Sequence, residues 1–287
     1  MPLLPVEQIQ ELVPPFRGDF GGKVAEALRK ALSIARISDV YDSISQYQGA
    51  DFAGMTLKGF DTTYQLAGEE NLLNLPEGPF ITISNHPYGG LDGIILIDLI
   101  GHLRKGFKVM VNEVLALVEA LRPSLIVVNP KTDASAGVTR KNIEGVREAL
   151  KTLKDGNPVG FFPSGAVSDL SLKERRIRDR EWQPSVIRII QKAKVPVVPI
   201  RYFDHNTMLF YLLGLIDWKI RISRLPRELV NKSKSLIRVA VGKPISPEEQ
   251  ARHSSLDELG KFLRDSVYDM PMPKKFISYE DFVARTR

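Results

Sequence analysis

The sequence of 287 residues contains no cysteine and only four histidines. The missing cysteines exclude disulfides, thiolate-bound zinc, iron–sulfur clusters and a thiol nucleophile. The histidines are scattered, and the His-Glu-x-x-His pattern of metal-binding helices is absent. We therefore expect no metal site and no tightly bound cofactor.

The sequence also lacks a hydrophobic segment long enough to span a membrane. Its longest apolar run is MLFYLLGLI at 208–216, roughly half of the ~20 residues that a membrane-spanning helix needs. The first residues, MPLLPVEQIQELVPPF, carry acidic residues and prolines where a signal peptide has a basic region and an apolar core. These features predict a cytoplasmic protein, either free or peripheral to the inner membrane.

Positive charge is in excess, with a formal net charge of +6 and a pI near 9.4. Such a balance favours an anionic partner, either nucleic acid, acidic lipid or a phosphorylated substrate, although a mildly basic soluble protein is also compatible with it. The aromatic residues lie in apolar runs rather than between basic residues, and no nucleic-acid recognition module is visible. We therefore do not expect nucleic-acid binding.

Short apolar runs alternate with amphipathic stretches between about residues 64 and 245. Runs rich in β-branched residues and separated by helices are typical of buried, largely parallel strands. The pattern predicts an α/β fold with a mostly parallel central sheet, flanked by helices and with N-terminal helices packed on it. The expected strands are 80–84, 108–112, 125–129, 158–163, 195–203 and 236–242, and the expected helices between them are 92–103, 140–156 and 180–194.

The two ends of the chain read as helical. Residues 6–47 have helical spacing of apolar positions, and 50–60 reads as a loop or short strand. Residues 247–268 form the expected closing helix, with Ser246 as its N-cap and Pro247 in its first turn. We divide the chain into an N-terminal helical segment, 1–55, and an α/β domain with the C-terminal helix, 56–287.

The stretch SNHPYGGLDG, residues 84–93, follows an expected strand and precedes an expected helix. In a parallel sheet, ligands gather at this strand-to-helix edge. The glycines permit a tight bend that could bring the carboxylate of Asp92 to the imidazole of His86. An aspartate bonded to Nδ1 fixes the tautomer and leaves Nε2 as a proton acceptor. The alternative is that Asp92 only caps the helix.

This stretch resembles the lysophospholipid acyltransferase superfamily of the glycerophosphate acyltransferase type. The most similar branch is the hemolysin-related one, with its ornithine- and glycine-lipid O-acyltransferases. The resemblance covers most of residues 60–245 through four blocks in order. They are LAGEENLLNLPEGP leading into NHPYGGLDG, then GFFPSGAVS, then VPVVPIRYFDHNT, and finally RLPRELVNKSKSLIRVAVGKPIS. The superfamily has four residues between its His and Asp, whereas this chain has HPYGGLD, with five.

The resemblance implies transfer of a fatty acyl group from an acyl carrier protein or coenzyme A thioester to the hydroxyl of a lyso-lipid. By that analogy His86 is the general base and Asp92 orients it, without an acyl-enzyme. Substrate would be bound by the residues around the pair and in the second block, together with basic residues near the family's phosphate-binding block. These residues are Asn85, Gly89, Gly90, Pro163, Ser164, Gly165, Arg140 and Lys141.

Two positions in the second block depart from the family's pattern. Branches that acylate a phosphate-containing acceptor have a Glu and an Arg where this chain has Ser164 and Val167. Without the arginine, a bidentate grip on a phosphate is missing. The acceptor is therefore left open between a lyso-aminolipid and lysophosphatidate.

Residues 207–229 set aromatic and apolar residues beside cations, which suits a lipid headgroup interface. We expect an anionic membrane surface to contact Phe210, Tyr211, Trp218, Lys219 and Arg221. The alternative is a core helix followed by a basic surface strand. The mixed-charge run 172–181 reads as a solvated helix face, or as a binding site for coenzyme A phosphates or the acidic surface of acyl carrier protein.

Two other functions are compatible with these motifs. A lipid or thioester hydrolase would use water as the acceptor in the same site. A non-catalytic peripheral membrane-binding protein would need only the amphipathic surface, and the intact His86 and Asp92 argue against it.

Overall fold

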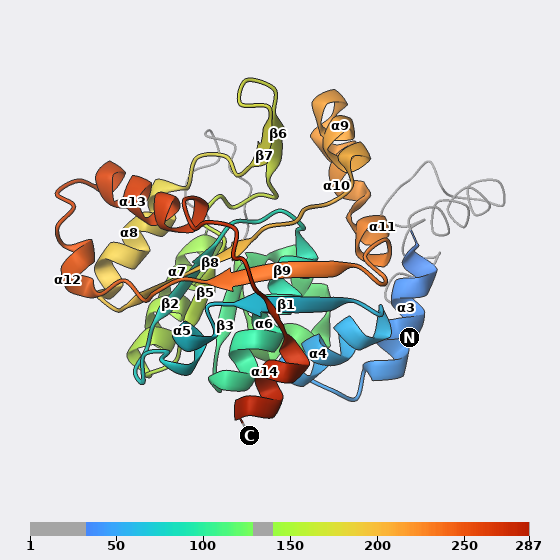
Figure 1. The fold of residues 1–287 in the computed structure, drawn as a ribbon, viewed down its shortest axis with the longest axis horizontal. Helices are drawn as coiled ribbons and strands as arrows, with labels where there is room; N and C mark the ends of the chain where they lie inside the picture. The colour runs from blue at the N-terminus through green and yellow to red at the C-terminus, as the bar shows by residue number, and fades with distance from the viewer. Residues whose placement is uncertain (1–32, 129–139, 287) are drawn as a thin grey trace.

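The computed structural model describes residues 33–128 and 140–286. Within them, eight strands form one sheet in the order β10-β1-β9-β8-β2-β5-β3-β4 (Figure 1). Their bounds are β1 Thr63–Ala67, β2 Ile81–Ser84, β3 Lys108–Asn112, β4 Leu125–Val128, β5 Val159–Phe161, β8 Val197–Tyr202, β9 Leu236–Val241 and β10 Ile277–Ser278. A separate hairpin pairs β6 (Asp169–Ser171) with β7 (Arg176–Arg178).

The expected fold class is confirmed, because most strand pairs in the sheet are parallel. β8, β2, β5, β3 and β4 run in one direction. β9 and β1 are parallel to each other, but β9 is antiparallel to β8, and the short β10 is antiparallel to β1. The site considered below belongs to the parallel part of the sheet.

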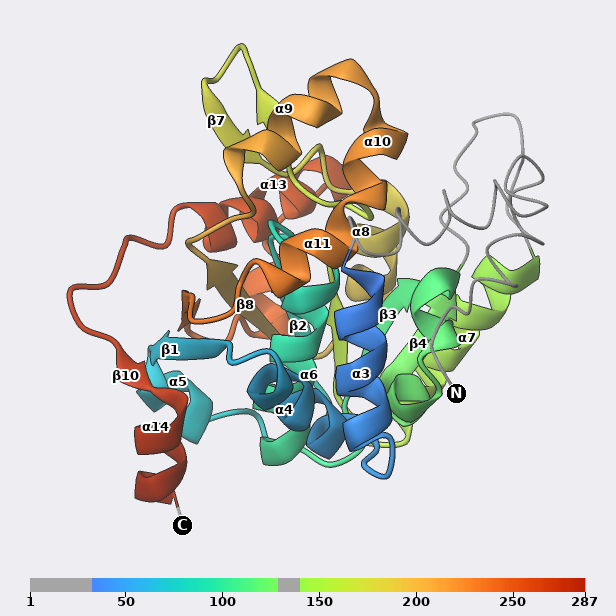
Figure 2. The same ribbon diagram turned by 90° about the vertical axis from the view of Figure 1, so that its right-hand side faces the viewer.

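Helices cover both faces of the sheet, and each face has its own hydrophobic core (Figures 1 and 2). One core packs α3, α4, α6 and α14 against the sheet. The other packs α7, α8 and α13 on the opposite face. The helices are α3 Ile34–Ile44, α4 Gly49–Gly59, α5 Glu69–Leu73, α6 Gly90–Leu103, α7 Arg140–Lys154, α8 Pro184–Ala193, α9 Met208–Ile216, α10 Trp218–Ser223, α11 Leu225–Val230, α12 Pro247–Gln250, α13 Leu256–Tyr268 and α14 Tyr279–Thr286. Two 3₁₀ helices, Glu113–Leu117 and Glu119–Ser124, precede β4.

The expectation of a loop or strand at 50–60 is wrong, since these residues form helix α4. Its glycines do not make turns. A Cβ on Gly54 would lie 2.6 Å from Asp98 Oδ1, and one on Gly101 of α6 would lie 2.9 Å from the Cβ of Ala50. The glycines therefore allow α4 and α6 to approach closely. The division expected at residue 55 falls within α4, and the helices expected before residue 33 lie outside the described residues.

Two further segments differ from the sequence-based expectations. The run 172–181 is not a helix face, because much of it belongs to the β6–β7 hairpin, whose Leu170 and Ile177 pack inward. Residues 208–230 form three helices rather than a helix and a strand, and Asp217, in an extended conformation, separates α9 from α10. The closing segment is divided into α12 and α13, each with a Ser N-cap and a Glu in the first turn.

Apart from the unpredicted β1 and β10, the expected strands of the sheet are found within about two residues of their expected ends. Among the helices of the described chain, none combines the length and the apolar character required to cross a bilayer.

Candidate active site

The candidate site lies in the turn between β2 and α6, at the carboxyl end of a strand paired with β8 on one side and β5 on the other. Gly89 makes the bend, with φ of 85° and ψ of −117°, a conformation that favours glycine. A Cβ there would lie 2.9 Å from Cδ2 of Leu225 and 3.2 Å from Cγ2 of Val167. The turn is therefore folded tightly back onto its neighbours, and Asp92 in the first turn of α6 faces His86.

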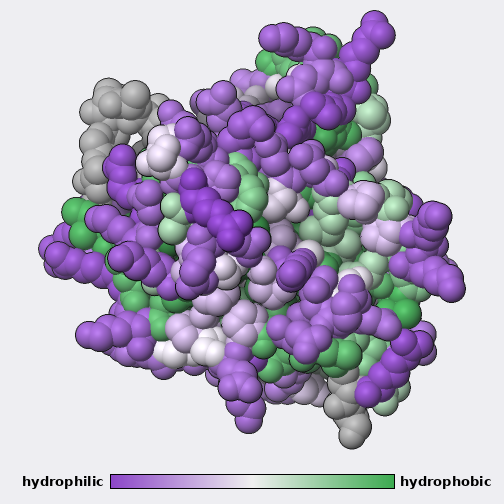
Figure 3. Space-filling model, turned by 60° about the vertical axis from the view of Figure 1, so that its left-hand side comes forward, coloured by the Kyte–Doolittle hydropathy of each residue, from purple (hydrophilic) through white to green (hydrophobic). Residues whose placement is uncertain are grey.

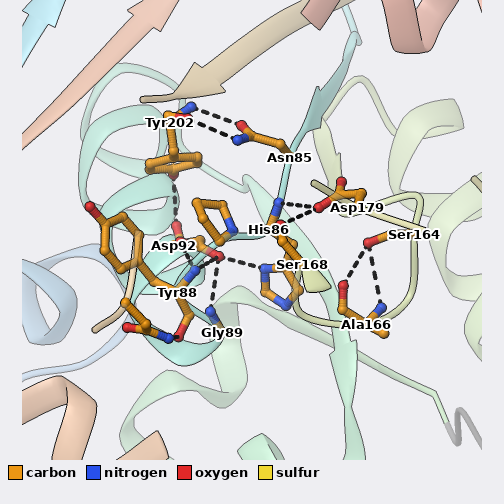
Figure 4. A network of polar contacts seen from close by, with 12 residues as sticks. Asn85, His86, Tyr88, Gly89, Asp92, Ser164, Ala166, Ser168, Asp179 and Tyr202 are labelled. Carbon is orange, nitrogen blue, oxygen red and sulfur yellow. Dashed lines mark hydrogen bonds and ion pairs between the residues drawn. The ribbon is translucent and has the colours of Figure 1, made fainter. Parts of the chain in front are cut away.

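The expected pairing of His86 and Asp92 is present in the structure. Nδ1 of His86 lies 2.6 Å from Oδ2 of Asp92 (Figure 4). The same carboxylate accepts hydrogen bonds from the backbone N–H groups of Tyr88, at 3.0 and 3.1 Å, and of Gly89, at 3.1 Å. Asp92 therefore caps α6 and lies within ion-pair distance of the imidazole, so the structure is compatible with both interpretations of the sequence.

Burial shapes the electrostatics of this pair. Asp92 is fully buried, and burial raises the pKa of its carboxyl above the ordinary value. The contact with His86 and the hydrogen bonds from Tyr88 and Gly89 act in the opposite direction and favour the charged form. An ionised Asp92 can stabilise an imidazolium on His86 as a proton is taken up.

The imidazole of His86 is held on several sides. Its ring, 17% exposed, stacks on the ring of Phe162 with centroids 4.2 Å apart. Its backbone N–H donates to Asp179 Oδ1 over 3.1 Å, and its carbonyl accepts from the N–H of Ser168 over 2.9 Å. With Nδ1 facing Asp92, Nε2 is the ring nitrogen left to accept a proton.

The loop 162–168 after β5 adjoins this turn, as the second sequence block predicted. Gly165 adopts φ of 65°, and its N–H donates to the carbonyl of Phe162 over 2.9 Å, which closes a tight turn. Ser164 is buried, and its hydroxyl donates to the carbonyl of Ala166 over 2.7 Å. The carbonyl of Pro163 accepts from the N–H of Gln183 over 2.8 Å. The side chain of Ser164 is thus used within the loop.

Asp179 is a residue of the site that the sequence analysis missed. Its buried carboxylate accepts from Ser168 Oγ over 2.5 Å and from Trp182 Nε1 over 3.2 Å, besides the N–H of His86. Burial raises its pKa. Asp179 lies near the end of the mixed-charge run 172–181, and the nearby Trp182 was the one signal that this end of the run is buried.

Asn85 has a structural role in the turn. Its side-chain amide donates to the carbonyl of Tyr202 and accepts from the N–H of Tyr202, both over 2.8 Å (Figure 4). The hydroxyl of Tyr202 in turn donates to the carbonyl of Asp92 over 2.8 Å. Both hydrogen-bonding atoms of the amide are used to join β2 to β8, which does not fit the expected substrate contact.

Next to the pair, the first turn of α6 has an open side. No heavy atom of the described residues lies within 4 Å of a Cβ built on Gly90 or on Gly93, one turn further. The expected contact of Gly90 with substrate is compatible with this open space and stays a prediction.

The structure does not bring Arg140 and Lys141 to the turn. They begin α7, which follows the edge strand β4, and β5 and β3 lie between β4 and β2. Arg140 is exposed, and its Nε lies 2.9 Å from Glu144 Oε1 on its own helix. The segment before them, 129–139, lies outside the described residues.

Three of the five residues expected at a membrane surface are buried instead. Phe210, Tyr211 and Arg221 have almost no exposed surface, whereas Trp218 and Lys219 are exposed. A cation in an apolar segment read as surface, but Arg221 is paired with Asp169 of the hairpin. Within residues 33–128 and 140–286 no group of three or more His, Asp or Glu side chains is arranged to hold a metal ion.

The chain is similar to known acyltransferases in sequence and in fold. It is 27% identical over 254 residues to a lyso-glycine lipid O-acyltransferase of Bacteroides thetaiotaomicron, covering 86% of this chain and 89% of the relative. It is also 27% identical over 230 residues to a lyso-glycine lipid O-acyltransferase of Phocaeicola vulgatus, covering 77% and 78%. The crystal structure of the 1-acyl-sn-glycerophosphate acyltransferase PlsC of Thermotoga maritima matches its fold with a TM-score of 0.50 and 16% identity, covering 89% and 90%.

The family expected from the four sequence blocks is confirmed by a separate comparison. The profile of a family described as acyltransferase matches residues 9–273, which is most of the chain. The chain therefore belongs to this acyltransferase family.

Proposed function

We propose that the protein transfers a fatty acyl group from a thioester to the hydroxyl of a lyso-lipid, with His86 as general base. The observation that carries this proposal is the 2.6 Å contact between His86 and a fully buried Asp92 at the carboxyl edge of the parallel strands. The donor is the thioester of coenzyme A or of acyl carrier protein, and it is bound only as a co-substrate.

The chemistry follows from the orientation of the imidazole. Nε2 of His86 accepts the proton of the acceptor hydroxyl while the hydroxyl oxygen attacks the thioester carbonyl carbon. The tetrahedral intermediate then expels the thiolate, and the thiolate takes from Nε2 the proton that came from the acceptor hydroxyl. The products are an ester and a free thiol. Asp92 stabilises the transient imidazolium. No covalent acyl-enzyme is required.

For the acceptor, a lyso-glycine lipid is our first choice and lysophosphatidate the second. Both curated relatives described above are named for lyso-glycine lipid. Val167, which stands where phosphate-acceptor branches have an arginine, is buried against Gly89 and cannot bind an anion. We further propose that the protein acts from the cytoplasmic side on the anionic surface of the inner membrane, where such acceptors lie.

The test is acyl transfer by the purified protein with labelled acyl carrier protein and coenzyme A thioesters, offered each lyso-lipid in turn. His86→Ala should abolish transfer. His253→Ala is the matched control, because His253 also stacks on a phenylalanine, Phe262, with centroids 4.2 Å apart, but makes no contact with the turn. Full activity of His86→Ala would refute the mechanism. Release of free fatty acid without any lyso-lipid would instead indicate a hydrolase, and no turnover with any acceptor would indicate a binding protein.

A further inference from the structure

Helices α9 and α10 form an arm, residues 208–223, beside the hairpin at residues 169–178, and both rise from the same end of the molecule (Figures 1 and 2). A third, small hydrophobic core holds them together. Phe210 and Tyr211 of the arm are buried in it with Val167 of the site loop, and Leu170 and Ile177 of the hairpin pack against them. The arm and the hairpin are thus one packed unit.

Buried polar contacts fix this unit in place. Arg221 of the arm pairs with Asp169 of the hairpin and donates to the carbonyl of Ser168 over 3.2 Å. Glu228 of α11 is buried and accepts from both the N–H and the hydroxyl of Thr207, the N-cap of α9, over 2.9 and 2.7 Å. Removing one partner of such a buried pair is destabilising. These contacts therefore hold the arm in a fixed position on the rest of the molecule.

The arm is directly connected to the catalytic turn. The hydroxyl of Tyr211 donates to the carbonyl of Pro87 over 2.7 Å. Leu225, which packs against the third core, lies next to Gly89, where a Cβ would approach it to 2.9 Å. The arm is therefore linked to the turn that carries His86 through directly packed residues.

The outer side of the arm is unusually apolar. Helix α9, MLFYLLGLI, has no charged side chain, and only Phe210 and Tyr211 are buried. A helix that is hydrophobic all round is expected to be buried in an apolar phase. Of the fourteen large hydrophobic side chains exposed in the described residues, seven lie on the arm. These are Met208, Leu209, Leu212, Leu215, Ile216, Trp218 and Ile220.

Basic residues outnumber acidic ones around this apolar surface. Lys219 and Asp217 lie within the arm, and the neighbouring hairpin carries Lys173, Arg175 and Arg176 at its exposed end, together with Leu172 and one acid, Glu174, which pairs with Arg176. Exposed apolar side chains with basic residues around them match a bilayer, in which anionic headgroups lie above hydrocarbon. By contrast, the side of the molecule that carries α12 and α13 is mostly hydrophilic, with apolar residues interspersed among charged ones (Figure 3).

We propose that the arm and the hairpin end form the surface by which the protein docks on an anionic bilayer. The apolar residues of α9 and α10 enter the headgroup boundary, and Lys173, Arg175, Arg176 and Lys219 contact anionic headgroups. This inference rests on the proposed function, because docking through the arm would place the turn with His86 beside an acceptor lipid in the membrane. A second copy of the chain is the competing occupant, but the net positive charge around the patch opposes a symmetric pairing of two such surfaces.

The test compares binding to phosphatidylglycerol-rich vesicles, measured by flotation, between the full-length chain and two triple variants. The docking variant is L215S/I216S/W218A, whose side chains are 47, 77 and 59% exposed. The control variant is L73S/L236S/M272S, whose side chains are comparably exposed on other elements, at 62, 48 and 48%. We expect the docking variant to lose on the order of 100-fold in partition coefficient, because each side chain forfeits part of its transfer from water, and the control variant to bind as wild type.

A charge variant and a soluble acceptor separate the possible outcomes. K173Q/K219Q should weaken binding to phosphatidylglycerol-rich vesicles about 10-fold or more and leave binding to phosphatidylcholine vesicles unchanged, since each cation contributes ~1 kcal/mol near an anionic surface. The docking variant should keep wild-type turnover of a short-chain, monomeric acceptor and lose turnover of acceptor held in vesicles. Equal vesicle binding by wild type and docking variant would overturn the docking surface. So would a wild-type dimer that the docking variant converts to monomers without lipid. Vesicle binding without any acyl transfer would leave the docking surface standing and refute the proposed function instead.

Discussion

Replacing Asp92 by asparagine tests the most specific feature of the site. One oxygen of the wild-type carboxylate, Oδ2, faces both Nδ1 of His86, at 2.6 Å, and the N–H of Gly89, at 3.1 Å, whereas Oδ1 accepts from the N–H of Tyr88 over 3.1 Å. An amide nitrogen in the place of Oδ2 would face Nδ1 of His86 and lose the hydrogen bond from Gly89, whereas an amide oxygen there would keep that bond but carry no charge to stabilise an imidazolium. In the first orientation the tautomer changes. Because the amide nitrogen and a protonated Nδ1 cannot donate to each other, the imidazole would carry its proton on Nε2, the atom that accepts the substrate proton in the proposed mechanism.

The expected loss follows from that wrong tautomer. General-base catalysis contributes ~10² to 10⁴ in rate, and we expect kcat of Asp92→Asn to fall about 10³-fold, equivalent to ~4 kcal/mol of barrier. KM for the acceptor should change little. The free energy of unfolding should stay within about 1 kcal/mol, because the neutral amide avoids the burial cost of the carboxylate and still accepts from the N–H of Tyr88.

The assay is steady-state acyl transfer together with urea unfolding, and Asp98→Asn is the matched control. Asp98 is also buried on α6 and also contacts a histidine one turn away, at 3.2 Å from His102 Nδ1, but it accepts from Tyr64 rather than facing the site. We expect that variant to lose ~1–3 kcal/mol of stability with its kcat unchanged. An Asp92→Asn enzyme with more than a tenth of wild-type kcat would refute the reasoning.

Three further predictions concern the surroundings of the pair. A hydrogen bond to Asp98 raises the pKa of His102 to about 9, so its stabilisation is complete below about pH 6.5 and lost as pH rises through about 9. Because the ring is 37% exposed, solvent screening reduces the contribution of this pKa shift to the free energy of unfolding to ~1–2 kcal/mol. It is measured as the difference in unfolding free energy between wild type and His102→Gln as a function of pH. A difference that does not change with pH would contradict the prediction. Gly89→Ala should lower the free energy of unfolding by ~1–3 kcal/mol and remove most of the activity. Gly90→Ala, with open space beyond its Cβ, should unfold as wild type and raise KM. Equal losses of stability in the two variants would contradict this prediction. Asp179→Asn, which puts an amide among three hydrogen-bond donors, should lower kcat about 10-fold with KM unchanged; unaltered kcat would exclude a positioning role.

The sequence predicts the parallel part of the fold well because its signals there are local. Buried parallel strands need continuous β-branched runs, and ITIS of β2 and LIVV of β4 are such runs. His86 and Asp92 are only six positions apart, and a single bend at Gly89 joins them. Short-range geometry could therefore be worked out without knowing the rest of the chain.

The errors arise where a distant partner decides the environment. Arg221 read as surface because its partner, Asp169, lies 52 positions away. The structural hydrogen bonds of Asn85 were not predicted because its partner, Tyr202, lies 117 positions away. Residues 50–60 read as a loop or short strand, whereas they form α4, whose Gly54 allows the close approach of α6. In each case the role of the residue depends on a tertiary contact that the local sequence does not show.

The double use of Asp92 has a consequence for when the enzyme becomes competent. The carboxylate that contacts the imidazole also caps the N-terminus of α6. The observed start of this helix therefore cannot form without placing the carboxylate against His86. In the proposed mechanism, the entropy and desolvation needed to align His86 and Asp92 are thus spent during folding, before the acceptor binds. When charge develops on the imidazole, the surrounding dipoles already point the right way and need not reorganise.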